Sequence, residues 1–252
     1  MRYIEHIIEP GRLLLSWQAP LGGGRYIVAE LCRRGHGNEA NLVYLLNTTD
    51  YAESRAVGFP GDYPGFPPDK EHVNVLAAFM RRLPPRHRGD FSQFLDAIRI
   101  PSGEKISDFA LLGYAGARLP GDDFSIIHPF DDATPPFEFL LLVAGYRYHQ
   151  ENVPRDSLKP GMAARFEFEP NNPNDPDAVR VVIPRVSEHT AGYVCRGLLP
   201  QFRRWIASGM AVEGTFDRLN GTGDRPLAYL FVTVREAASS FKTDELVAKA
   251  SS

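Results

Sequence analysis

Short apolar runs separated by turns characterise the first fifty residues. The stretches RLLLSW (12–17), RYIVAELCR (25–33) and NLVYLLN (41–47) are rich in residues that favour β-strands. A run of glycines at 22–24 separates the first two stretches and suits a tight turn. The pattern predicts three strands near the start of the chain.

The period of the pattern changes after residue 70. Apolar positions recur at spacings of three and four over 72–83 and 90–100, as they do on one face of a helix, while 109–117 is apolar without a clear type. Residues 118–136 are rich in Pro and Asp and predict an irregular connector. Residues 1–134 are therefore predicted to form an α+β domain, with the domain boundary near Pro135-Pro136.

The second half is mostly strand-like around one helix at 198–209. Its strand-like segments are EFLLLVAGYRY, MAARFEFEP, AVRVVIP, GYVC, AVEGTFDRL and AYLFVTVRE. Five or six short strands around one helix fit a small barrel or an open, OB-like sheet. We expect this mainly β domain to span 137–237, and we expect 238–252 to be a flexible tail.

A polar corner, EPNNPNDPDAVRV (169–181), precedes one of these strands. Prolines restrict φ, and the Asn and Asp side chains can bind their own backbone. The corner is predicted to be a rigid turn, and the sequence pattern alone leaves open whether it has a further role.

Composition and charge exclude several classes of protein. The chain has 252 residues, of which 43% are hydrophobic, and its net charge of -3 provides no overall positive field for nucleic acid. Two scattered cysteines predict neither a disulfide framework nor a zinc site. The charged N-terminus is not typical of a signal peptide, and the longest apolar run, 137–145, is too short to span a bilayer. We expect a soluble, cytoplasmic protein.

Three motifs in the second half occur in a specific order: VAGYRY (143–148), FEPNNPNDPDAVRV (168–181) and AGYVCRGLLPQF (191–202). In order and spacing they resemble the HIRAN domain. The resemblance implies a six-stranded, OB-like barrel with helices that binds single-stranded DNA at a free 3′ end, and it covers about two fifths of the chain.

The resemblance also implies roles for individual residues. Arg147 corresponds to a phosphate or backbone contact, Tyr148 to a stacking platform, and Asp175 to the acceptor of the 3′-hydroxyl. Arg196 stands where the family has a phosphate-binding lysine. Asn174 stands where a second stacking aromatic is expected, so about 1–3 kcal/mol of stacking is missing, and binding is weaker or the ligand differs. Three alternatives stay open: Arg147 and Tyr148 are only exposed strand residues, Asp175 only braces its own turn, and Arg196 is an ordinary solvated arginine.

The segment 79–117 carries a second resemblance. FMRRLPPRHR, DFSQFL and SDFALLGYAGA resemble the small N-terminal subdomain of HipA-type serine/threonine kinases. This resemblance implies a kinase-associated binding domain detached from its kinase, as in toxin–antitoxin systems. A kinase core is not expected, because the sequence has no Gly-rich phosphate loop with a nearby lysine, no catalytic loop and no DFG motif.

The sequence offers no recognisable catalytic or metal-binding pattern. Its seven histidines show no zinc-protease or deaminase spacing, and no GxSxG motif is present. We therefore predict a non-catalytic protein without cofactor or metal that binds single-stranded DNA or DNA ends. The alternative is a protein-interaction regulator of a HipA-like kinase. A nuclease is a third hypothesis.

Overall fold

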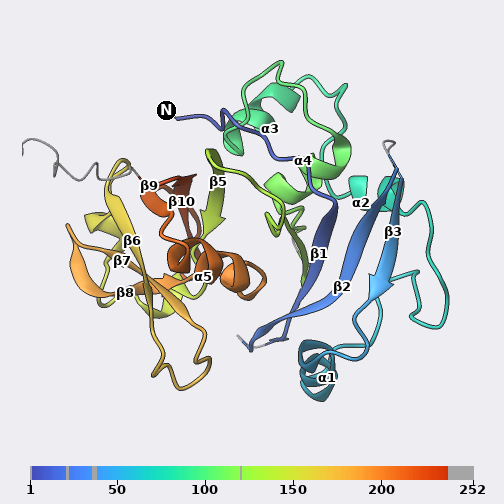
Figure 1. The fold of residues 1–252 in the computed structure, drawn as a ribbon, viewed down its shortest axis with the longest axis horizontal. Helices are drawn as coiled ribbons and strands as arrows, with labels where there is room; N and C mark the ends of the chain where they lie inside the picture. Colours follow the sequence, from blue (N-terminus) through green and yellow to red (C-terminus); the bar gives the residue numbers. More distant parts are fainter. Residues whose placement is uncertain (1, 21–22, 36–38, 120, 238–252) are drawn as a thin grey trace, which may run out of the picture.

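Two antiparallel sheets organise the part of the chain that the computed structural model describes, which comprises residues 2–20, 23–35, 39–119 and 121–237 (Figure 1). The first sheet has the order β3-β2-β1-β4. Its strands are β1 (Arg12–Gln18), β2 (Arg25–Arg34), β3 (Glu39–Tyr44) and β4 (Phe124–Ile127). The three strands predicted near the start of the chain are confirmed. The predicted flexible tail, 238–252, lies outside the described residues.

The prediction that 118–136 is an irregular connector is wrong at β4. This strand pairs with β1 in antiparallel register, with Leu14 opposite Ile127 and Trp17 opposite Phe124. Phe124 and Ile126 alternate onto one face of the sheet and are buried there. The apolar alternation of these four residues outweighs the Pro and Asp on either side.

The helices of the first half are α1 (Thr49–Ala56), α2 (Leu76–Met80), α3 (Phe91–Ala97) and α4 (Asp108–Ala115). The two helices predicted in the first half are shorter than predicted, α1 was not predicted, and the apolar segment 109–117 is mostly helical. The segment before α2 is extended, because His72 accepts a hydrogen bond from Leu42 of β3, at 2.9 Å. Beyond α3, Arg99 adopts a φ of 62° and turns the chain out of the helix.

The two faces of the first sheet have different partners. Leu13 points towards α4, where a Cβ added to Gly113 would lie 2.6 Å from the Leu13 side chain. On the opposite face, Ile27 and Ile127 contact Gly197 of the second half. The first sheet is therefore packed between its own helices and the C-terminal half.

The second sheet has six strands in the order β5-β10-β9-β6-β7-β8, as expected for the second half. The strands are β5 (Phe137–Leu142), β6 (Ala163–Phe168), β7 (Val179–Ile183), β8 (Ser187–Tyr193), β9 (Ala211–Gly221) and β10 (Pro226–Arg235). Helix α5 (Leu199–Ala207) follows the short 3₁₀ turn η4 (Arg196–Leu198). A bridge between Ala144 and Tyr193 joins the ends of the two edge strands, with N–O distances of 2.8 and 2.9 Å.

The prediction that one strand runs from 138 to Tyr148 is wrong. Gly145 adopts a φ of 74°, and the next three residues form the 3₁₀ turn η2 (Tyr146–Tyr148). The turn lies directly against β8, because a Cβ added to Gly192 would meet the carbonyl oxygen of Ala144 at 2.5 Å. Only glycine allows this approach of the two backbones.

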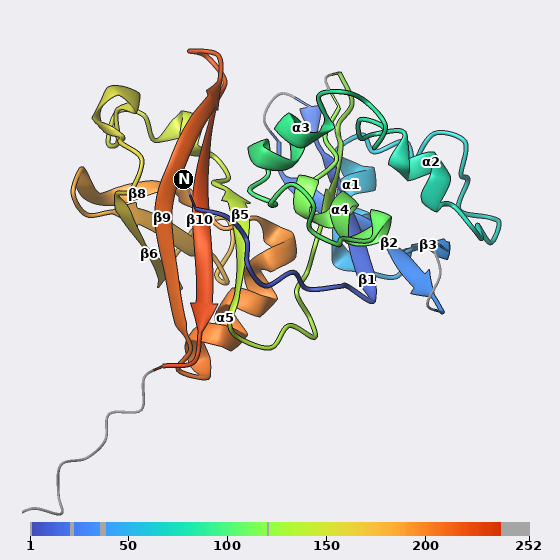
Figure 2. The same ribbon diagram turned by 90° about the horizontal axis from the view of Figure 1, so that it is seen from above.

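The N-terminal segment crosses from one half to the other (Figures 1 and 2). The guanidinium of Arg2 lies 5.0 Å from the ring centroid of Phe231 in β10. The backbone N–H groups of Glu5 and His6 both donate to the carboxylate of Glu138 in β5, at 3.1 Å. Further on, the Ile8 N–H donates to the Tyr114 hydroxyl of α4 at 2.9 Å. In the described part of the chain, no helix is both long and apolar enough to cross a bilayer.

Replacing Gly192 by Ala is expected to destabilise the second sheet. The new Cβ would clash with the Ala144 carbonyl, and the φ of 144° disfavours any side chain, so we expect a loss of roughly 3 kcal/mol in the free energy of unfolding. Urea denaturation measures the loss. The control is Gly161→Ala, where φ is 92° but nothing lies within 4 Å, so that only backbone strain of about 1 kcal/mol applies. Equal losses for the two variants would contradict the clash.

His128 is expected to make the fold sensitive to acid. Its Nε2 donates to the Ile8 carbonyl and its Nδ1 accepts from the Phe130 N–H, both at 3.0 Å, and burial lowers its pKa to about 4. In the unfolded state His128 has its ordinary pKa, so the unfolded chain takes up the proton at a higher pH than the folded protein does. The free energy of unfolding therefore falls by about 2 kcal/mol as the pH drops from 7 to 4.5. Urea denaturation at both pH values measures the change. In the His128→Asn variant this pH-dependent loss should vanish. If the variant shows the same pH dependence as the unchanged protein, His128 is not its cause.

Candidate functional site

The polar corner that precedes β7 is held by its own side chains. The Asn172 Oδ1 accepts hydrogen bonds from the backbone N–H groups of Asn174, at 2.9 Å, and Asp175, at 3.2 Å. The Asp175 Oδ1 accepts from the Asp177 N–H at 2.9 Å. The prediction that Asn and Asp side chains bind the backbone of the corner is confirmed at these two positions. The corner is thus rigid before any ligand arrives.

A network of three side chains anchors the corner to β8. The Glu169 Oε2 accepts hydrogen bonds from the Asn172 Nδ2, at 2.6 Å, and from the Tyr193 hydroxyl, at 2.9 Å. Burial and then the bond to Glu169 raise the pKa of Tyr193, so the phenol stays protonated and donates. Sequence reasoning assigned no role to Glu169 or Tyr193, although Tyr193 lies within the third motif, AGYVCRGLLPQF.

Arg147 and Tyr148 form a stacked pair on η2. The guanidinium of Arg147 lies 4.5 Å from the ring centroid of Tyr148 and donates to its hydroxyl. Tyr148 is 62% exposed, although most large aromatic side chains of a folded protein are largely buried. An exposed ring backed by a cation is suited to stacking against a planar, electron-rich group.

The polar corner and the residue that follows the stacked pair, His149, both contact Tyr193. Next to Tyr148, the ring of His149 lies 5.7 Å from the ring of Tyr193. On its other side, the Tyr193 hydroxyl lies 3.2 Å from the Asn172 Nδ2, and Asn172 holds the backbone of Asp175. Tyr193, in the third motif, therefore contacts both the corner and the residue directly after the first motif.

Arg196 does not point freely into solvent. Its Nε lies 3.1 Å from the Asp50 Oδ1 and its Nη1 lies 3.4 Å from the Glu53 Oε2, both on α1 of the first half. Its guanidinium also lies 5.6 Å from the ring centroid of Tyr26. Burial, chiefly, raises the pKa of Asp50, and the negative charge of Asp175 contributes to the rise. The alternative of an ordinary solvated arginine is therefore wrong, and Arg196 lies near the corner, where α1 partly neutralises it.

Asn174 is exposed and provides no ring, but another aromatic lies beside the corner. Phe168, at the end of β6, is 41% exposed, and the guanidinium of Arg203 lies 5.2 Å from its ring centroid. The Arg203 Nη1 is 3.0 Å from the Asp177 Oδ1. The corner thus has an Arg-backed aromatic ring at Phe168, a second one besides that of Tyr148. Sequence reasoning did not identify Phe168, because its exposure follows from its position at the strand end.

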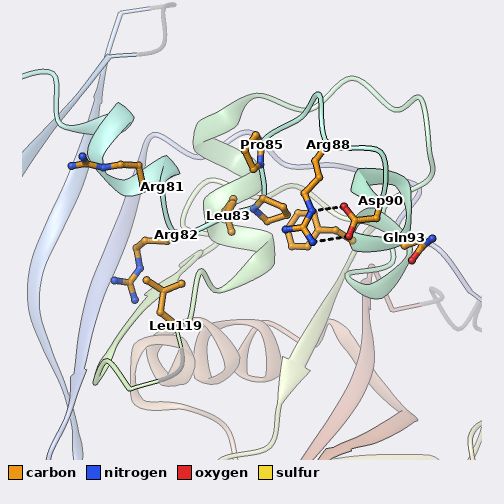
Figure 3. A pocket seen from close by; sticks show the side chains of 10 residues that line it. Arg81, Arg82, Leu83, Pro85, Arg88, Asp90, Gln93 and Leu119 are labelled. Atoms are coloured by element: carbon orange, nitrogen blue, oxygen red, sulfur yellow. Dashed lines mark hydrogen bonds and ion pairs between the residues drawn. The ribbon is translucent and has the colours of Figure 1, made fainter.

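A hollow of about 500 Å³ in the first half lies beside α2 and α3, and its lining includes none of the predicted site residues (Figure 3). The guanidinium of Arg82 is held there by both carboxylate oxygens of Asp122, and Arg88 pairs with Asp90 at 2.6 Å. Figure 3 shows the Arg81 side chain pointing away from the Arg88–Asp90 pair. The hollow is lined by cations that are largely neutralised, and we assign no role to it.

Comparisons with known proteins find a family match in the second half. Residues 137–216 match the HIRAN domain family, a DNA-binding domain, so the match supports nucleic-acid binding by this half. The crystal structure of the human HLTF HIRAN domain is 18% identical over 38% of this chain and 74% of that one, with a TM-score of 0.31. A crystal structure of a Lactobacillus plantarum protein is 22% identical over 38% and 91%, with a TM-score of 0.32. No curated protein matches the chain. These matches do not support the HipA-type resemblance of 79–117.

Replacing Asn172 by Ala is expected to loosen the corner. The variant removes the acceptor of two backbone N–H groups and a donor to Glu169, so we expect a loss of about 1–2 kcal/mol in the free energy of unfolding. Hydrogen exchange at the Asp175 amide should accelerate as well. The matched control is the exposed Asn171, whose side chain makes no hydrogen bond to any described residue. If Asn171→Ala has the same effects, the network does not hold the corner.

Proposed function

We propose that the HIRAN domain of this protein binds a single strand of nucleic acid at its 3′ end, and that it acts by binding and not by catalysis. The observation that carries the proposal is the exposed ring of Tyr148, which is backed by Arg147 and is followed by His149, whose ring lies beside Tyr193 of the rigid corner's network. Stacking on an aromatic platform is how proteins hold an unpaired base whatever its identity.

Asp175 is suited to recognise a terminal hydroxyl. Its Oδ1 is used by the Asp177 N–H, while its Oδ2 has no hydrogen-bond partner among the described residues. A carboxylate oxygen fixed in this way can accept a hydrogen bond from a sugar hydroxyl. The same charge repels a terminal phosphate, so Asp175 would distinguish a free 3′ end from a phosphorylated one.

The backbone phosphates would meet a small number of cations. Arg147 is available beside the platform, and Arg196 shares its charge with Asp50 and Glu53. The net charge of -3 supplies no wide basic surface. Binding should therefore weaken only moderately with salt, as expected for a local clamp on a strand end.

Phe168 offers a place for a second base. Its ring is backed by Arg203, as that of Tyr148 is backed by Arg147. It could therefore replace part of the stacking that is missing at Asn174.

A binding role is also favoured by the side chains available. The described residues contain no group of three or more His, Cys, Asp or Glu that could hold a metal ion, and the sequence carries no nucleophile motif. Regulation of a HipA-like kinase stays a prediction of the sequence without a structural observation in its favour.

The Tyr148→Ala variant is expected to lose about 1–3 kcal/mol of binding free energy for a short single-stranded oligonucleotide, because one stacked base loses its platform. Tyr148→Phe keeps the ring and should bind nearly as the unchanged protein does. Fluorescence polarisation with 5′-labelled oligonucleotides measures both variants. A 3′-phosphate on the oligonucleotide should weaken binding by about 1 kcal/mol or more. Equal affinity for free and phosphorylated 3′ ends would refute end recognition.

A further inference from the structure

Two acidic side chains of helix α1, in the first half, contact Arg196 of the second half. The Arg196 Nε lies 3.1 Å from the Asp50 Oδ1, and its Nη1 donates to the Glu53 Oε2 at 3.4 Å. Both acids lie outside residues 137–216, which match the HIRAN domain family. Their effect on Arg196 therefore belongs to the way in which this chain joins its two halves.

The two acids are held differently. The Asp50 Oδ2 also accepts a hydrogen bond from the Ile27 N–H of β2, at 2.7 Å, and 17% of the Asp50 side chain is exposed. The Glu53 side chain is 48% exposed, and Arg196 is its only ion-pair partner among the described residues. An exposed ion pair between long side chains contributes little stability. Asp50 is therefore a fixed partner of Arg196, and Glu53 is a displaceable one.

The guanidinium of Arg196 has a limited surface left for a ligand. It lies over the ring of Tyr26, 5.6 Å from the ring centroid, and its Nε is next to Asp50. A guanidinium binds phosphate most strongly through two parallel N–H groups, and those of Nη1 and Nη2 are the pair that remains. Glu53 lies at Nη1. A phosphate and Glu53 would therefore compete for the same donors.

Backbone hydrogen bonds place this competition next to the polar corner. The Ala178 N–H donates to the Asp175 carbonyl at 3.0 Å, and the Val194 N–H donates to the Val179 carbonyl at 2.9 Å. Val179 directly follows the corner as the first residue of β7. Arg196 comes two residues after Val194. A strand whose end lies at Asp175 would therefore bring its backbone phosphates into the region of Arg196.

We infer that Glu53 of α1 occupies the place of a backbone phosphate on Arg196 in the free protein, and that strand binding displaces it. The inference rests on the proposed function and makes α1 a built-in competitor of the ligand. In this exchange Arg196 replaces a carboxylate oxygen by a phosphate oxygen, and the Glu53 side chain turns into solvent. Asp50 and Tyr26 keep the guanidinium in position throughout. The first half thus lowers the affinity of the second half for a strand.

The test uses the full chain and a 5′-labelled deoxythymidylate dodecamer with a free 3′ end. Glu53→Gln keeps the shape of the side chain and removes the competing charge, so fluorescence polarisation should show binding that is about twofold to fivefold tighter. Arg196→Gln should weaken binding, and adding Glu53→Gln to that variant should give no further gain. A role of Glu53 in stability alone would not produce a gain that depends on Arg196. Because Glu53 is exposed, its variant is expected to fold, and thermal unfolding confirms this.

Glu213→Gln is the matched control, since Glu213 is also an exposed glutamate paired with an arginine, Arg235. It lies near the start of β9, at the end of the β9–β10 pair away from Ala228, whose carbonyl binds the Val143 N–H just before η2. The variant removes the same charge and should leave the affinity unchanged. If it tightens binding as much as Glu53→Gln does, the effect is one of net charge and the inference is wrong.

The remaining outcomes separate the inference from the proposed function. If the unchanged protein binds the dodecamer and Glu53→Gln binds it no more tightly, the competition is wrong while strand binding stands. A gain that persists without Arg196 would overturn the inference as well. Binding by Glu53→Gln, but not by the unchanged protein, would support it and show that α1 masks the site. If neither protein binds, both the proposed function and the inference are overturned.

Discussion

The close contact of η4 with the first sheet is the constraint on which the junction of the two halves depends. Gly197 has no side chain, and a Cβ there would lie 2.8 Å from the Cδ1 of Ile127 and 3.2 Å from that of Ile27. The backbone of η4 can therefore lie directly on the apolar face of the sheet. This contact places Arg196 within reach of Asp50 and over Tyr26. The ion pair between Arg196 and Asp50 therefore depends on one small residue.

Arginines connect segments that are distant in sequence, and this use limits the cations left for a ligand. Arg12 of β1 binds Asp131 at 2.6 Å, and Asp131 also accepts a hydrogen bond from Gln201 of α5, at 2.5 Å. Arg99 connects the end of α3 to Asp217 of β9. Charges used in this way hold the halves together and contribute little field outside the protein.

The sequence predicted those parts of the fold that depend on local composition. Strands such as β1 and β2 are visible because each is a short run rich in apolar residues that favour β-strands, and a glycine turn separates the two. Strand β4 was missed because its four residues, flanked by proline and aspartate, are too few to show a recognisable pattern of apolar positions. Pairing with β1 stabilises this strand. The helices were predicted too long, since the bond between Leu42 and His72 makes the preceding segment extended. Tertiary contacts decide these points, and local propensity does not.

The candidate site also contains features that the local sequence predicts and features that only tertiary contacts decide. The corner at 169–178 was predictable, because Asn and Asp next to prolines bind their own backbone. The partners of Arg196 were not predictable, since Asp50 and Glu53 are more than 140 residues away in sequence.

The N-terminal segment has a consequence for the independence of the two halves. Its backbone covers Glu138 of β5, and Arg99 of the first half covers Asp217 of β9, so that both carboxylates lie almost entirely out of water. A fragment that began at residue 137 would leave both acids with no donor from the first half and would uncover the ring of Phe231. The second half therefore depends on the first for the environment of its acids: residues 137–237 alone would leave Glu138 without its backbone donors and would leave Asp217 with Arg218 as its described donor.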